Sequence, residues 1–321
     1  MAGATPHSTI RVAARLANGF VLDIVKLIGF GRDVIDGLLI TAISQANVAQ
    51  ITRSPELQLT YATLDNPPPD DLRRPVSISA VANSLHIPFE TARRRIGALA
   101  DLGIILTTPK GVIMPTAPLN SPLYRMGAEG HYSIVRRLYF RMRALGVLDD
   151  LPGPVHPVAF EPENPPIRLV LRLSSDYLLR LAEPMNANMG DVLTGMVLSD
   201  LIQANTEQLG DDQGGSAGGD WDAAGFVDDA LRRPARTAEM AQRLGVPAET
   251  VRRHLQRLEK SGLCERIENG YVVTARILAR PAFVQFMMDN QSHLHRFFGA
   301  LAEFGVISQW DREESALRGA A

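Results

Sequence analysis

The sequence "ETVRRHLQRLEKSG" occupies residues 249–262, and "ETARRRIGALADLG" occupies residues 90–103. Both stretches open with Glu-Thr-x-Arg-Arg and close with glycine. In the later stretch, Val251, Leu255 and Leu258 recur at the spacing of one face of a helix. The chain is therefore predicted to contain nearly the same basic, amphipathic helix twice.

The similarity extends far beyond these helices. Residues 72–148 align without a gap with residues 231–307, and 20 of the 77 aligned positions are identical. Upstream, "DVIDGLLITAISQAN" from Asp33 aligns with "DVLTGMVLSDLIQAN" from Asp191. A repeat of this length indicates two copies of one structural unit.

These alignments predict a mainly α protein built from two duplicated helical units. The first repeat would span residues 1–150 and the second residues 167–321, and "IRVAARL" from Ile10 matches "IRLVLRL" from Ile167 near their starts. Residues 151–166 are rich in proline, which is excluded from helix interiors and central strands. We interpret them as a linker.

Each repeat contains the same predicted order of local elements. In the second, "TAEMAQRLGV" from Thr237 has helical spacing, with Thr237 as an expected cap and Gly245 as the end. The basic helix follows, and then two short β-prone runs surround Asn269-Gly270, which is a strong hairpin signal. In the first repeat the hairpin would turn at Lys110-Gly111.

This order of helix, turn, helix and hairpin resembles the winged helix-turn-helix domain of bacterial transcription regulators, in the general style of the MarR, GntR and IclR families. The resemblance covers about residues 72–115 and about residues 231–276. It implies that the second helix of each motif, residues 89–102 and 248–261, enters the DNA major groove and that the hairpin wing contacts phosphates or the minor groove. A proline at position 88 or 247 replaces the capping Ser or Thr of many relatives.

Arginine side chains on the exposed face of such a helix suit guanine edges and phosphate oxygens. Arg94 and Arg253 are the expected base contacts, unless they only pair with the glutamates four residues earlier on a solvated face. The candidate DNA-binding residues are Thr91, Arg93, Arg94, Arg95 and Lys110 in the first repeat, and Thr250, Arg252, Arg253, Gln256, Arg257 and Arg266 in the second.

The two basic helices differ at two positions. Gln256 and Arg257 of the second are replaced by Gly97 and Ala98 in the first. We therefore predict that the second repeat dominates base recognition, whereas the first mainly contacts phosphates.

The charge distribution agrees with double-stranded DNA as the partner. The net charge is −2, yet residues 72–115 hold six basic and two acidic side chains, and residues 231–276 hold ten and five. The rest of the chain is strongly acidic, and such a body disfavours nonspecific binding to polyanions.

The sequence contains no phosphate-cradling glycine motif and no recognisable catalytic triad, so we expect no enzymatic activity and no cofactor. His293 and His295 would point to different sides of a helix, and the single Cys264 reads as a buried apolar residue, so no metal site is expected. Residues 19–30 are apolar but contain Asp23 and Lys26, too charged for a membrane span. We expect a cytoplasmic protein.

The favoured function is sequence-specific transcription regulation. A tandem winged-helix scaffold of the chromosome-segregation type, which binds protein, and a plasmid replication initiator are the alternatives. The apolar helical segments 10–50 and 167–208 need a covering partner, either the other repeat in an intramolecular pseudo-dimer or a second chain in a homodimer. The sequence indicates neither an operator nor a small-molecule effector.

Overall fold

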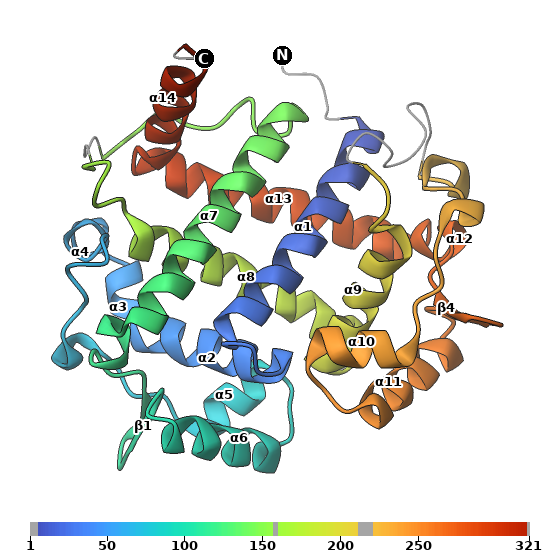
Figure 1. Ribbon diagram of the computed structural model, residues 1–321, viewed down its shortest axis with the longest axis horizontal. Helices are drawn as coiled ribbons and strands as arrows, with labels where there is room; N and C mark the ends of the chain where they lie inside the picture. The colour runs from blue at the N-terminus through green and yellow to red at the C-terminus, as the bar shows by residue number, and fades with distance from the viewer. Residues whose placement is uncertain (1–5, 157–159, 211–220, 320–321) are drawn as a thin grey trace. The chain divides into compact units, whose positions relative to one another are not determined.

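The computed structural model describes residues 6–156, 160–210 and 221–319, with the side chains of 186–188 excepted, so part of the predicted linker, residues 157–159, lies outside the described residues. The fold is mainly helical, as predicted, with two small antiparallel hairpins (Figure 1). Among the described residues, no helix is long and apolar enough to cross a membrane.

The chain folds into two compact modules. Module A comprises Leu39–Arg180 and His293–Ala321, and module B comprises Met1–Leu38 and Leu181–Ser292. Module A therefore holds the segment 72–115, and module B holds the segment 231–276. Helices α2 (Val34–Asn47), α8 (Ile167–Met189) and α13 (Pro281–Glu303) each contribute residues to both modules.

The remaining elements belong to one module each. Module A contains α3 (Ala49–Thr52), α4 (Pro55–Thr60), η1 (Asp70–Leu72), α5 (Ile78–Ser84), α6 (Phe89–Asp101), β1 (Leu106–Thr108), β2 (Gly111–Ile113), η2 (Pro118–Asn120), α7 (Pro122–Ala144) and α14 (Val306–Gly319). Module B contains α1 (His7–Ile28), α9 (Val192–Thr206), η4 (Ala223–Gly225), η5 (Asp229–Leu231), α10 (Thr237–Leu244), α11 (Ala248–Lys260), β3 (Glu265–Ile267), β4 (Gly270–Val272) and α12 (Ala275–Leu278).

Helix α9 is the centre of module B. Every residue from Val192 to Leu201 is buried, because α1, α10 and α11 all pack against this helix. Asp191 caps its N-terminus, where a carboxylate oxygen accepts a hydrogen bond from the backbone N–H of Thr194 at 2.8 Å. On the α1 side, the amide of Asn18 donates to the carbonyl of Ser199 at 2.9 Å.

The predicted helix-turn-helix is present in module B. Helix α10 ends at Leu244, and the next residue, Gly245, adopts the left-handed conformation (φ 68°) that glycine allows without a Cβ clash. The expected cap by Thr237 is wrong, because α10 begins at this residue and no side chain caps the helix. Three residues, 245–247, separate α10 from α11, which begins at Ala248.

The hairpin of module B also forms where it was predicted. Strands β3 and β4 pair antiparallel from Glu265↔Val272 to Ile267↔Gly270, and Ala235 adds an isolated bridge to Tyr271. Gly270 is required there, because its φ is 147° and a Cβ would collide with the carbonyl of Ala235.

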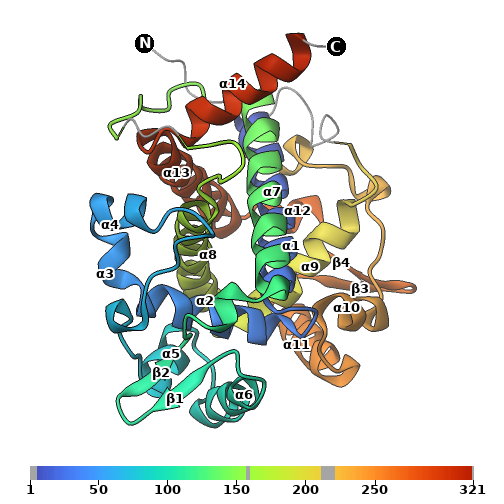
Figure 2. The same cartoon turned by 60° about the vertical axis from the view of Figure 1, so that its left-hand side comes forward.

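Module A also contains two short helices followed by a hairpin. Helix α6 and strands β1 and β2 lie at an offset of 159 residues from α11, β3 and β4 (Figure 2). Val76 forms the bridge to Val112 that Ala235 forms to Tyr271. Ser77 caps α5 by accepting a hydrogen bond from the N–H of Ala80 at 3.1 Å.

The core of module A includes α7, the first half of α8 and α14. The indole N–H of Trp310 donates to the Tyr132 hydroxyl at 2.6 Å, and both side chains are buried. His131 lies 2.6 Å from the Ser174 hydroxyl, and complete burial lowers the pKa of this imidazole to about 3.

The compact modules differ from the division predicted at residues 150 and 166. Module B takes α1 from the first repeat, and module A takes residues 167–180 from the second. The reason is packing: α1 buries Ile10, Leu16 and Phe20 within module B. Apolar spacing predicts that a face is covered but does not identify the covering element.

Candidate nucleic-acid interface

Helix α11 divides into a buried face and a polar face. Val251, Leu255 and Leu258 are each at most 1% exposed, as the spacing predicted. Met240 and Leu244 of α10 are buried with them. This packing leaves the other side of α11 at the surface, where long polar side chains can reach a ligand.

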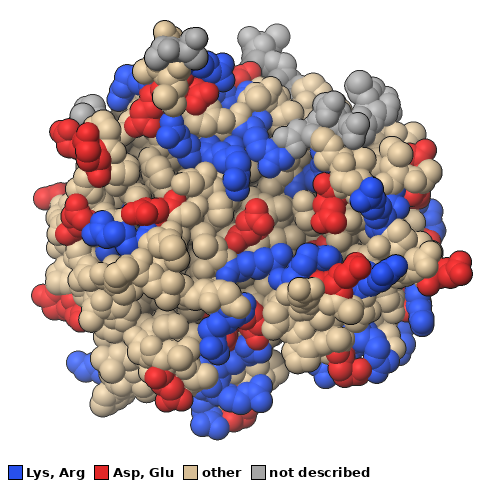
Figure 3. Space-filling model, viewed as in Figure 1, with Lys and Arg blue, Asp and Glu red and all other residues tan. Residues whose placement is uncertain are grey.

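The candidate residues of module B occupy different environments. Arg252, Arg253, Arg257 and Arg266 are exposed, whereas Thr250 and Gln256 are half-buried. Gln256 is thus less exposed than Arg253 and Arg257 on the same helix. Figure 3 shows basic side chains interspersed with acidic ones over α11 and over α6.

The glutamate of each helix pairs with the arginine three residues later, not four. Arg252 donates to Glu249 at 2.6 Å and Arg93 donates to Glu90 at 2.9 Å. The hydrogen bond from Arg252 lowers the pKa of Glu249, and the bond to Glu90 raises the pKa of Arg93. The proposed pairing with Arg94 and Arg253 does not form.

Because Glu249 pairs with Arg252, the guanidinium of Arg253 is left to contact a ligand. Neither Arg253 nor Arg94 forms an ion pair with another described residue, and both are exposed. A guanidinium without an internal partner keeps its full set of donors for a base edge or a phosphate.

Arg257 has a partner that the sequence did not indicate. Its guanidinium donates to Asp191 at 2.7 Å, and His254 lies 2.8 Å from the Thr194 hydroxyl. Burial lowers the pKa of His254. These contacts attach α11 to the N-terminus of α9, so a base contact by Arg257 would compete with its ion pair.

A second ion pair attaches α10 to α9. Arg243 donates to both carboxylate oxygens of Asp200, at 2.8 to 3.1 Å, and Lys26 lies 4.0 Å from the same carboxylate. Asp200 is almost fully buried. Burial alone would lower the pKa of Arg243, but hydrogen bonding to Asp200 outweighs it and the pKa is raised.

The hairpin is anchored to α9 through Asn205, which is fully buried. Its amide N–H groups donate to the carbonyls of Arg233 at 2.7 Å and Tyr271 at 3.2 Å, and its oxygen accepts from the N–H of Val273 at 2.9 Å. The Gln-Ala-Asn shared by the two repeats was the only sequence signal for this residue.

The candidate residues of module A also differ in exposure. Arg93, Arg94 and Lys110 are exposed there, and Thr91 and Arg95 are half-buried. Large apolar side chains are also exposed around α6, namely those of Phe89, Leu102 and Leu106.

Within the described part of the chain, no group of three His, Cys, Asp or Glu side chains could hold a metal ion. Cys264 is buried, as expected, and burial raises the pKa of its thiol to about 12.

Residues 231–276 match the DeoR-like helix-turn-helix domain family. This segment has the bounds that the sequence predicted. The matched family differs from the MarR, GntR and IclR families whose winged helix the sequence resembles. It supports DNA as a partner and transcription regulation as the function. The match covers far less than half of the chain. No curated protein and no solved structure matches the chain.

Proposed function

We propose that this chain is a sequence-specific regulator of transcription that binds double-stranded DNA through two winged helices. The observation that carries the proposal is the DeoR-like match over residues 231–276, combined with the exposed Arg252 and Arg253 on its second helix. We further propose a cytoplasmic location and no catalytic activity.

Equivalent hydrogen bonds support a second winged helix in module A. Asn47 donates to the carbonyls of Arg74 at 2.8 Å and Val112 at 3.2 Å and accepts from the N–H of Met114 at 2.8 Å. Asn205 forms the same three hydrogen bonds with the aligned residues Arg233, Tyr271 and Val273.

A buried arginine gives a further correspondence. Arg73 pairs with Asp70 at 3.2 Å, and Arg232 pairs with Asp229 at 3.0 Å. The asparagine contacts favour duplication of one unit, because they join residues up to 68 positions apart and recur at matching positions in both segments. The arginine pairs are local, three residues apart, and recur at the same offset.

The composition of the modules supports an intramolecular pseudo-dimer. Each module combines segments of both predicted repeats, as domain-swapped subunits do. A homodimer of such chains is the alternative, and sedimentation of the purified protein distinguishes the two.

The arrangement of charges supports unequal roles for the helices. Arg253 in module B has no internal partner and lies within the matched domain, so it is the residue we expect to read a base. In module A, we expect Arg93, Arg95 and Lys110 mainly to contact phosphates.

Selection of binding sites from randomised duplexes tests the proposal. One enriched motif should appear, and the logarithm of affinity should fall steeply with the logarithm of salt concentration as phosphates are neutralised. No enrichment together with a flat salt response would contradict DNA binding.

The alternatives predict other outcomes. A partner retained in a pull-down after nuclease treatment would favour the scaffold, whereas capture of origin DNA alone would favour the initiator. Exposed arginines on both helices favour DNA over an exclusively protein partner.

A further inference from the structure

Module B contains a cavity of about 340 Å³ bordered by α1, α8, α9, α12 and α13. Its walls are mostly apolar and include Leu181, Met185, Leu198, Phe283 and Phe286. The volume lies at the lower end of the range for small-molecule sites.

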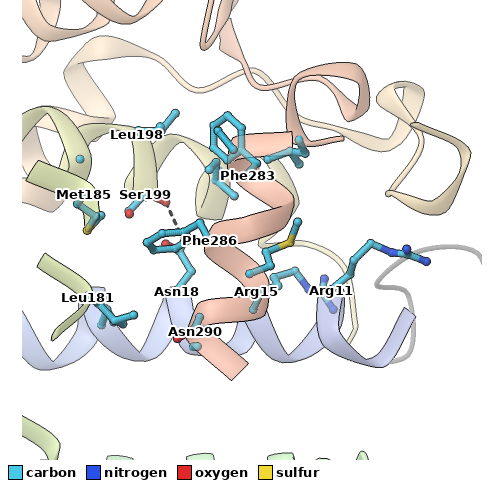
Figure 4. Close-up of a pocket in the computed structure, with 18 of the residues that line it drawn as sticks. Arg11, Arg15, Asn18, Leu181, Met185, Leu198, Ser199, Phe283, Phe286 and Asn290 are labelled. Carbon is cyan, nitrogen blue, oxygen red and sulfur yellow. Dashed lines mark hydrogen bonds between the residues drawn. The ribbon is translucent and has the colours of Figure 1, made fainter. Parts of the chain in front are cut away.

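The two arginines labelled in Figure 4 lie toward one end of the cavity, whereas Asn18, Ser199 and Asn290 lie nearer its centre. Figure 4 shows Arg11 and Arg15 toward one end of the site, Leu181 and Met185 at the other, and Phe286 between them. The wall thus offers positive charge at one end and hydrocarbon at the other.

Four arginines line the cavity, and no Asp or Glu does. Arg232 is more than nine-tenths buried, and its Nη1 has no hydrogen-bond partner among the described residues. The Arg232 guanidinium pairs with Asp229 at 3.0 Å through its Nε. Arg280 is half-buried, and its guanidinium has no ion-pair partner in the described chain. Unused buried donors favour an anionic acceptor, because an unmet donor costs free energy.

We infer that this cavity binds a small amphiphile with one anionic head group, which the arginines hold, and an apolar body, which Met185, Leu198 and Phe286 cover. A water molecule occupies about 30 Å³, so the cavity accommodates a ligand of roughly ten to fifteen non-hydrogen atoms. Decanoate has this size and chemistry.

Helix α9 connects the cavity to the DNA-binding segment. Leu198, Ser199 and Ile202 line the cavity, whereas Asp200 on the same helix holds α10 through Arg243. Leu263, close behind the end of α11, also lines the cavity. A ligand that moves α9 therefore moves α10 and α11 with it.

Isothermal titration of the full-length protein with decanoate, decanol and decyltrimethylammonium tests the ligand class. We expect decanoate to bind with one site per chain, decanol about tenfold more weakly because it lacks the charge-assisted hydrogen bonds, and the cation not at all. Equal binding of decanoate and decanol, binding of the cation, or no binding of decanoate would overturn the inference.

Variants locate the site. Arg280→Met should weaken decanoate binding about tenfold and leave decanol binding unchanged, and Arg15→Met tests a second lining arginine in the same way. Ala14→Phe should block both ligands by filling the cavity. Arg53→Met is the matched control, because Arg53 is exposed in module A and should have no effect. Unchanged decanoate binding in both Arg280→Met and Ala14→Phe would place the ligand elsewhere.

The effect on DNA rests on the proposed function and is measured separately. Decanoate should change the Kd for a selected DNA fragment about fivefold or more, and the DNA should change the Kd for decanoate by the same factor. Decanoate binding with an unchanged DNA Kd would refute the coupling. A protein that binds decanoate but no DNA would refute the proposed function and leave the cavity assignment intact.

Discussion

Replacing Asn205 with alanine should destabilise the hairpin of module B selectively. The substitution removes three buried hydrogen bonds. The carbonyl of Tyr271 keeps a partner, because the N–H of Ala235 also donates to it at 3.0 Å. The carbonyl of Arg233 and the N–H of Val273 lose the bonds that Asn205 supplied. At about 1–3 kcal/mol for each buried unpaired group, the expected cost is about 3 kcal/mol.

Hydrogen exchange resolved by peptide is the appropriate measurement, because two modules need not unfold in one step. Peptides covering residues 265–276 should exchange about 100-fold faster in Asn205→Ala, whereas those covering residues 106–117 should not change. Asn47→Ala is the matched variant and should reverse this pattern. Equal acceleration of both hairpins, or a change below about threefold, would refute the assignment of Asn205 as a local anchor.

Three further predictions concern recognition, packing and pH. Arg253→Ala should relax base preference at one position of the selected site, and Arg94→Ala should do so less; the opposite order would move base recognition to module A. Arg243→Met should cost about 3 kcal/mol in urea unfolding because it leaves Asp200 charged and buried, and a cost below about 1 kcal/mol would contradict that burial. The low pKa of His131 keeps it neutral when folded, so its contribution is complete above about pH 6.5 and declines as the pH falls toward 3. The stability advantage of wild type over His131→Leu should therefore be about 2 kcal/mol smaller at pH 5 than at pH 7, and a constant difference would show that His131 protonates readily.

Local features of the fold could be predicted from the sequence because their causes are local. The stripe of Val251, Leu255 and Leu258 requires only helical spacing, and the hairpin requires β-prone runs around Asn269-Gly270. Both are present. The same reasoning placed Arg253 on the exposed side of its helix.

Long-range partners could not be predicted in this way. Asp200 lies on an apolar helix face, and only the fold brings Arg243, 43 residues later, against it. The cavity could not be predicted from the sequence either, because residues from five separate helices line it. The sequence also could not reveal that α1 belongs to the module of the second repeat.

The same contacts suggest why the two helix-turn-helix segments should respond differently to a ligand. In module B, the pairs Asp200–Arg243 and Asp191–Arg257 connect α9 to α10 and α11. In module A, Ala42 aligns with Asp200. Because alanine has an uncharged side chain, Ala42 cannot form the ion pair that Asp200 forms with Arg243. Because movement of a helix is transmitted through contiguous packed and paired side chains, we expect an occupied cavity to act on the module B helices first.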